Sequence, residues 1–206
     1  MTSLGFSDIR LWRRKVEMTQ LTANKSPQAK TEKDPLRYLL RVDRAGRPLG
    51  FAEKEKCHRG RGLWHSAFLV MVFDGRGRLM LARRSHQKKL WPDFWDGTVA
   101  GHFSQGISPE RAPGARVREE IGATCDSLEF LFEFPYQSNY EDVGVEKEVC
   151  RIFKARAIPR SAISPDEAEI SEFRFSSLPA LRREVKSRPS EFTPWFLLAF
   201  ARLPKR

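Results

Sequence analysis

Short apolar runs separated by glycine-containing turns constrain the fold of this chain more than any other sequence feature. Residues 36–54 read as a hairpin around Asp43-Arg44-Ala45-Gly46, and residues 65–84 repeat the pattern around Asp74-Gly75-Arg76-Gly77. Three further runs have the composition of strands, and they cover residues 128–136, 145–157 and 170–175. Hairpins join neighbouring strands in opposite directions, so these runs predict a mixed, largely antiparallel sheet.

Helical patterns follow the hairpins. One pattern ends at Ile121-Gly122, where glycine suits the residue after a helix, and Pro113 favours a start near Ala112. Residues 178–187 and 193–203 predict two closing helices, the second apolar enough to pack on the sheet. Helices packed on a sheet make an α/β fold. We therefore expect a single domain over residues 35–206, preceded by a mobile basic tail over residues 1–34, which are polar and without a sustained period.

Composition narrows the class of protein. The 206 residues include 15 Phe and 5 Trp, which need a buried core and exclude disorder for the bulk of the chain. The longest apolar run, Ala67 to Phe73, is far shorter than the roughly 18 residues of a membrane span. The first residues contain no apolar segment typical of a secretory signal, and three cysteines at unrelated spacings fit a reducing compartment. These features favour a cytoplasmic protein without a membrane segment.

Basic residues exceed acidic ones, 37 Lys+Arg against 26 Asp+Glu, which gives a formal net charge of +11. Such a charge suits nucleic acid, an acidic surface or a small polyanionic substrate. The densest basic run, residues 76–89, is accompanied by no nucleic-acid-binding motif. A nucleic-acid partner is therefore unfavoured, although the run is also compatible with a plain solvated face.

Two pairs of carboxylates are spaced for chemistry. Arg116, Glu119 and Glu120 fall on one face of the predicted helix, where they suit either a divalent cation bound to phosphates or a solvent-facing ladder of ion pairs. Glu146 and Glu148 leave the same face of a predicted strand. Two adjacent carboxylates repel unless a cation lies between them or one is protonated, which favours metal binding or acid–base work over a wet strand face.

Histidines offer a second ligand type. The chain has four, His58, His65, His86 and His102, and imidazoles with carboxylates commonly bind Mn, Zn or Fe. Separated histidines are more often structural or exposed, so spacing alone leaves both interpretations open.

The span from Gly101 to Gly122 resembles the Nudix box, a loop–helix–loop that binds diphosphates through divalent metal. Residues 36–200 as a whole resemble type I isopentenyl diphosphate isomerase, a Nudix-fold enzyme. The matching text stands in the family's order: EKEKCHRGRGLWHSAF, LARRSHQKKLWPDFW, VAGH, REEIG, GVEKEVC and EFTPW. The resemblance implies a Nudix-like α/β/α sandwich that acts on a small-molecule diphosphate.

The resemblance also assigns residues to roles. It implies a site of three imidazoles and two carboxylates for Mn²⁺ or Zn²⁺, made of His58, His65, His102, Glu146 and Glu148. It implies that Glu120 holds a Mg²⁺ against the diphosphate, and that the basic contacts to the diphosphate are Lys54, Arg84, Lys88 and Arg116. Tyr136 and Glu148 match the pair that handles a proton on one face of the isoprenyl group. Trp195 matches the aromatic residue that steadies the carbocation.

Two departures from the family pattern bear on the reaction. The isomerases place a cysteine before the Gly-His, where it exchanges a proton on the opposite face, and this chain has Ala100 there. The family's W-T-N is also changed, to Trp95-Asp96-Gly97. A hydrolytic Nudix box is incomplete too, because Ile107 and Arg116 stand where it has glutamates, and Ala115 where it has arginine.

Three functions follow from the resemblance and its departures. The first is an isomerase that interconverts isopentenyl and dimethylallyl diphosphate, impaired by the missing cysteine. The second is a Nudix diphosphohydrolase acting on a prenyl or nucleoside diphosphate, with Glu119 and Glu120 carrying the metal. The third is an inactive diphosphate-binding protein. Nothing in the sequence distinguishes a monomer from an oligomer.

Overall fold

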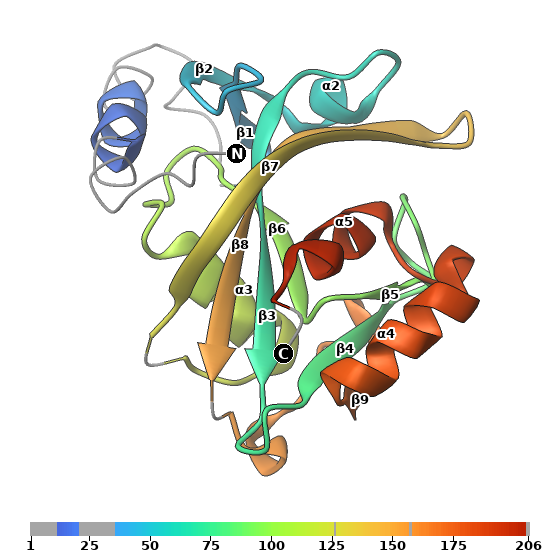
Figure 1. Ribbon diagram of the computed structural model, residues 1–206. Helices are drawn as coiled ribbons and strands as arrows, with labels where there is room; N and C mark the ends of the chain where they lie inside the picture. The colour runs from blue at the N-terminus through green and yellow to red at the C-terminus, as the bar shows by residue number, and fades with distance from the viewer. Residues whose placement is uncertain (1–11, 21–35, 126, 157, 205–206) are drawn as a thin grey trace. The chain divides into compact units, whose positions relative to one another are not determined.

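The computed structural model describes residues 12–20, 36–125, 127–156 and 158–204 (Figure 1). Its strands are β1 (Tyr38–Val42), β2 (Pro48–Glu53), β3 (His65–Phe73), β4 (Leu79–Arg84), β5 (Trp95–Asp96), β6 (Val99–His102), β7 (Glu129–Tyr140), β8 (Gly144–Arg156) and β9 (Ile170–Ser176). Its helices are α2 (Lys54–His58), α3 (Ala112–Ile121), α4 (Leu178–Ser187) and α5 (Pro194–Arg202), with short 3₁₀ turns at η2 (Arg160–Ala162) and η3 (Pro189–Glu191). Residues 12–20 are also helical.

Both predicted hairpins are confirmed. In the first, β1 pairs antiparallel with β2, from Tyr38 opposite Glu53 to Val42 opposite Pro48. The Asp43 carboxylate closes the turn, because it accepts hydrogen bonds from the backbone N–H groups of Ala45 and Arg47, each at 2.9 Å. In the second hairpin, Asp74 plays the same role between β3 and β4.

The strands form a sheet in which β3 takes part in several pairings. Hydrogen bonds join the strands in the order β2-β1-β3-β4-β5, while β6 and β8 also pair with β3, β7 pairs with β8, and β9 pairs with β4. Five of the strand pairs are antiparallel, namely β1–β2, β1–β3, β3–β4, β4–β5 and β4–β9. Every residue of β3 is buried, as expected for a strand covered on both faces. The expected α/β class with a largely antiparallel sheet is therefore confirmed.

The predicted helices are present with the expected ends. α3 starts at Ala112 and ends at Ile121, and Gly122 follows with a positive φ of 68°, which glycine adopts without strain. The apolar face of α5 is buried, and its Phe196 ring stacks with those of Phe192 and Phe200 at centroid distances of 5.7 and 5.5 Å. The sequence did not predict α2, since five residues are too few to show a helical period.

Contacts divide the chain into two compact units. Of the described residues, the first unit takes those up to Phe68 and those of 102–112 and 132–151, and the second takes those of 69–101, 113–131 and 152–204. In the first, the buried Phe68 ring meets Phe103 edge-on at a centroid distance of 5.2 Å. In the second, Leu79, Met80 and Leu81 of β4 are wholly buried. The assignment of residues 35–206 to one domain stays a prediction.

Residues 12–20 form a helix that the sequence did not predict. The Arg151 guanidinium lies over the Trp12 ring, 3.6 Å from its centroid, and Val16 is buried. The Gln20 amide donates to the carbonyls of Ser104 and Ile107 at 3.2 and 2.8 Å. The rest of residues 1–34 lies outside the described part of the chain, so the mobile tail stays a prediction. In the residues that the structure describes, no helix has the length and apolarity needed to cross a membrane.

Candidate functional site

A cluster of histidines and glutamates lies in the first unit. One ligand atom from each of five residues falls within 4.8 Å of all the others: His58, His65, His102, Glu146 and Glu148. The carboxylates of Glu146 and Glu148 are buried, with residue exposures of 7% and 4%. The strand face that carries them is therefore not wet, and the five residues singled out by the resemblance come together.

Local structure aims these side chains at one point. His58 ends α2, His65 opens β3, and the His102 at the end of β6 lies on a strand that pairs with β3. The Nδ1 atoms of His58 and His65 lie 2.7 and 2.8 Å from the backbone carbonyls of Lys54 and Leu63. A carbonyl only accepts, so each Nδ1 carries a proton and donates, which leaves the Nε2 atoms directed into the cluster.

The donor set fits a divalent transition metal. The Nε2 atoms of His58 and His102 lie 3.3 Å apart, and His58 Nε2 lies 3.0 Å from Glu146 Oε2. His65 Nε2 and Glu146 Oε2 are buried, and their contacts within the described residues are with other members of the cluster, such as His65 Nε2 to Glu148 Oε1 at 3.2 Å. Burying two carboxylates side by side is costly, and a cation between three imidazoles and two carboxylates would offset their charge. The cluster can therefore hold a metal ion.

Glu148 and Tyr136 form a buried, hydrogen-bonded pair. The Tyr136 hydroxyl donates to Glu148 Oε2 at 2.5 Å, and His102 Nε2 lies 2.9 Å from Oε1 of the same carboxylate. Burial raises the pKa of Tyr136 well above its usual value, and the nearby Glu148 charge adds to this. Burial opposes ionisation of Glu148 as well, but hydrogen bonds with His102 and His65 outweigh it and hold its pKa well below the usual value.

Gly62 lies in the turn between His58 and His65, and a side chain at this position would test how closely the residues around the cluster pack. A Cβ added at Gly62 would lie 2.6 Å from Val145 Cγ1 and 3.0 Å from the Cys57 carbonyl, at a φ of +60°. Gly62→Ala is expected to lower the free energy of unfolding by about 2–4 kcal/mol, from the clash and the left-handed backbone together.

The matched control for this change is Gly60→Ala. Gly60 has nearly the same φ, +61°, but nothing lies within 4 Å of an added Cβ. Gly60→Ala is expected to lower the free energy of unfolding by about 1 kcal/mol, because only the left-handed backbone conformation disfavours alanine there. Urea unfolding curves of the two variants would measure the difference, and equal losses would contradict the close packing around Gly62.

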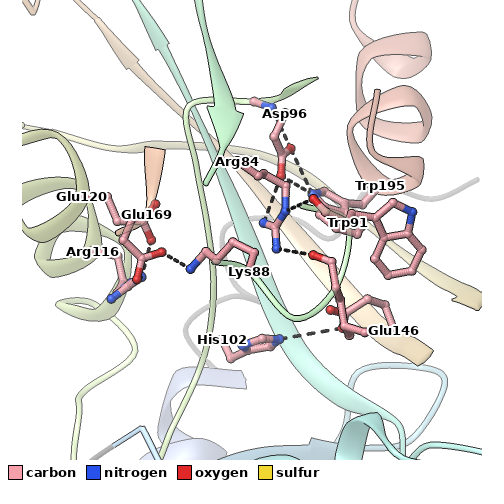
Figure 2. A network of polar contacts seen from close by, with 12 residues as sticks. Arg84, Lys88, Trp91, Asp96, His102, Arg116, Glu120, Glu146, Glu169 and Trp195 are labelled. Carbon is pink, nitrogen blue, oxygen red and sulfur yellow. Dashed lines mark hydrogen bonds and ion pairs between the residues drawn. The ribbon is translucent and has the colours of Figure 1, made fainter. Parts of the chain in front are cut away.

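The second unit contains a separate cluster of basic and acidic side chains (Figure 2). Arg116 pairs with Glu120, and it lies 2.9 Å from Glu119 and 3.3 Å from Glu169. Lys88 pairs with the other oxygen of Glu169. Glu119 is exposed but Glu120 is buried, so these residues are not simply a solvent-facing ladder. Burial raises the pKa of Glu120 to about 7, although the charge of Arg116 opposes the shift.

Arg84, Asp96 and Trp195 form a third group, also within the second unit (Figure 2). The Trp195 indole N–H donates to both carboxylate oxygens of Asp96, at 3.0 and 2.8 Å. Arg84 lies 3.7 Å from Asp96 Oδ2, and its guanidinium carbon is 5.3 Å from the Trp195 ring centroid. Arg84 also donates to the carbonyls of Trp91 and Leu90, at 3.0 and 2.9 Å, which fixes the guanidinium in place.

Two residues of these groups were missed by sequence reasoning. Asp96 had a visible signal, because it departs from the family's W-T-N, but nothing in the sequence pairs it with Trp195. Glu169 had no signal at all, since it stands in a polar loop far along the chain from Lys88 and Arg116. Lys54, the remaining basic residue implied by the resemblance, is an exposed residue at the start of α2 in the first unit. Its role stays a prediction.

Comparisons with known proteins agree with the sequence motifs. Residues 63–196 match the NUDIX domain. The isopentenyl-diphosphate Delta-isomerase of Citrobacter koseri is 33% identical over 162 residues, which cover 78% of this chain and 88% of that protein. The isopentenyl-diphosphate Delta-isomerase of Haloarcula marismortui is 30% identical over 180 residues, which cover 85% of this chain and 96% of that protein.

Solved structures support the fold. The DR0079 protein of Deinococcus radiodurans has a TM-score of 0.65 at 18% identity, covering 80% of this chain and 98% of its own. The MutT protein of Methanosarcina mazei Go1 has a TM-score of 0.53 at 18% identity, covering 69% of this chain and 96% of its own. Together with the family match, these likenesses confirm the expected Nudix-like α/β fold.

Proposed function

The chain belongs to the NUDIX family, in the branch of the isopentenyl-diphosphate Delta-isomerases, and we propose that it interconverts isopentenyl and dimethylallyl diphosphate by moving protons. The observation that carries this proposal is the hydrogen bond from Tyr136 to Glu148 within the histidine–glutamate cluster. A hydrolase needs no buried hydroxyl–carboxylate pair of this kind, whereas protonation of an alkene needs a general acid shielded from water.

Each residue of the proposal has a defined task. Tyr136 and Glu148 deliver a proton to C4 of isopentenyl diphosphate, and the π face of Trp195 stabilises the tertiary cation that forms at C3. The five ligands of the histidine–glutamate cluster would hold Mn²⁺ or Zn²⁺, and Glu120 would hold Mg²⁺ beside the diphosphate. When bound, such cations supply positive charge that neutralises carboxylate and diphosphate oxygens.

The diphosphate is assigned to the basic side chains. Arg84, Lys88 and Arg116 already pair with carboxylates, so their charges are oriented before a ligand arrives. A diphosphate oxygen is the same kind of acceptor as a carboxylate oxygen, and arginine binds either with two parallel hydrogen bonds. We propose a small-molecule diphosphate as the partner of this site and the cytoplasm as its compartment.

The test of the proposed function is NMR of the metal-loaded protein with isopentenyl diphosphate in D₂O, with proton and phosphorus signals followed together. The expected result is dimethylallyl diphosphate that carries deuterium, with both phosphorus signals still those of a diphosphate. Release of phosphate would instead assign the protein to the hydrolases. A spectrum unchanged in both channels would overturn the isomerase proposal.

Arg116→Gln is expected to weaken diphosphate binding by about 10–150-fold, since hydrogen bonds to charged groups contribute about 1.5–3 kcal/mol. The measurement is KM for isopentenyl diphosphate, or calorimetric binding of inorganic pyrophosphate. Arg118→Gln is the matched control, because this change removes the same charge from an exposed position on the same helix. An Arg116 variant no weaker than the Arg118 variant would contradict the assignment of Arg116 to the diphosphate.

A further inference from the structure

The two departures from the isomerase pattern lie within one short segment. Ala100, in place of cysteine, removes the side chain that would exchange a proton at C2. Asp96, four residues earlier, adds a carboxylate where the family has threonine. One titratable side chain is lost and another is gained between Trp95 and His102. The proposed function assigns no residue to remove the C2 proton, and it gives Asp96 no role in the reaction.

Asp96 is built into the interior rather than left at the surface. Its residue exposure is 3%, and its backbone pairs with Ala82 across β4 and β5. Paired residues and those two positions away share a face of the sheet, so Asp96 and Arg84 lie on the same face. The following residue favours this arrangement, because a Cβ at Gly97 would lie 2.7 Å from Leu69 Cδ1 and the Gly97 N–H donates to Asp96 Oδ1 at 2.7 Å.

The neighbours of Asp96 indicate which substrate atom it would meet. Trp195 donates to it at 2.8 Å, and Arg84 lies 3.7 Å away. Under the proposed function, Trp195 faces the cation at C3 and Arg84 contacts the diphosphate attached to C1. C2 is the atom between C1 and C3. Because Asp96 contacts both side chains, we associate its carboxylate with C2 rather than with C4.

We propose that Asp96 is the base that removes the C2 proton, in the role that the family gives to the missing cysteine. The inference rests on the proposed function. Protonation turns the C3=C4 electron pair into a C4–H bond and leaves the cation at C3. Asp96 Oδ2 then takes the C2 proton, and the C2–H electron pair becomes the C2=C3 double bond. The diphosphate stays attached, no oxidant or reductant is used, and solvent returns both groups to their starting protonation states.

The environment of Asp96 suits a base near neutral pH. Burial raises its pKa to about 6, while the Arg84 charge and the hydrogen bond from Trp195 oppose the shift. Among the described residues, Arg84 of β4 is the charged group that faces it, and Trp195 of α5 and the Gly97 backbone contribute neutral N–H donors. A base with a pKa close to the working pH combines the correct protonation state with a useful driving force.

The test compares Asp96→Asn with Asp93→Asn in D₂O. Asparagine retains an oxygen that accepts from Trp195 but does not take up a proton, so kcat for dimethylallyl diphosphate is expected to fall about 10²–10⁴-fold with little change in KM. Deuterium exchange at C4 of isopentenyl diphosphate should persist, because Tyr136 and Glu148 are intact. Asp93 is exposed and has a positive φ of 63° that asparagine tolerates, so its variant should match the wild type.

A double variant separates proton transfer from positioning. Asp96→Asn combined with Ala100→Cys returns a proton carrier by the family's own route, and its turnover is expected to exceed that of Asp96→Asn at least tenfold. Full turnover by Asp96→Asn alone, or no recovery in the double variant, would overturn the proposal. Absence of turnover and of C4 exchange in the wild type would instead mean that the proposed function has failed, and the role of Asp96 with it.

The pH profile of the wild type gives a measurement that needs no variant. The carboxylate is the active form, so kcat is expected to rise with pH through an apparent pKa near 6 and then level off. The same step should be present in Asp93→Asn and absent from the double variant. A wild-type profile without a step between pH 5 and pH 7 would contradict Asp96 as the base.

Discussion

Glu148→Gln is expected to lower isomerase turnover by about 10²–10⁴-fold, the usual contribution of a general acid or base. Glutamine has the size of glutamate and still accepts a hydrogen bond from Tyr136, but it neither carries nor relays a proton. Glu148 is 4% exposed and bonded to Tyr136 at 2.5 Å, so we expect proton transfer at this position to depend on its carboxylate. Deuterium exchange at C4 should disappear together with product formation.

The control for this variant is Glu141→Gln, at the exposed turn between β7 and β8. It makes the same chemical change near the same two strands and is expected to leave turnover unchanged. Initial rates from NMR and the C4 exchange rate should be measured for both variants. Wild-type rates in Glu148→Gln would contradict a role for Glu148 in the reaction. Exchange at C4 without product would indicate that Glu148 acts after the first proton transfer.

The sequence predicted most elements of the fold because their signals are local. The turns at Asp43 and Asp74 and the glycine after α3 are short-range features, and the structure has them where expected. The helix at residues 12–20 was missed because Trp12 packs on Arg151 and Phe103, which are distant in the sequence, and a nine-residue segment gives little period of its own. Tertiary contacts, rather than helix propensity, hold such a segment.

In the candidate site, too, local spacing could be predicted from the sequence but tertiary contacts could not. The i, i+2 spacing of Glu146 and Glu148 is visible in the sequence, and so is their need for a cation or a proton. The sequence does not show that His58, His65 and His102 converge on them. That convergence arises from the pairing of β3 with β6 and from the position of α2, and only the resemblance predicted it. The Asp96–Trp195 bond joins residues 99 positions apart, so no local pattern encodes it. Motif transfer finds shared residues but is silent where this chain departs from the family.

Binding of Mn²⁺ or Zn²⁺ is expected to raise the melting temperature of metal-free protein by about 5–11 °C. A ligand that binds only the folded state at 100 times its Kd stabilises it by about 2.7 kcal/mol, and each kcal/mol shifts the melting temperature of a chain of this size by about 2–4 °C. The direction follows from the cluster, where five ligand atoms converge only after folding. Thermal unfolding after chelation and after addition of each metal would measure the shift.

Two variants show whether the shift belongs to this cluster. Glu146→Gln keeps the side-chain size but removes the charge of one ligand, so most of the metal-induced shift is expected to vanish. His86→Ala removes the one histidine outside the cluster, which is exposed, and should retain the full shift. Equal shifts in both variants would place the metal elsewhere on the protein. If no shift occurs in the wild type with either metal, the cluster is held by its own hydrogen bonds, and proton transfer by Glu148 would have to proceed without a cation beside it.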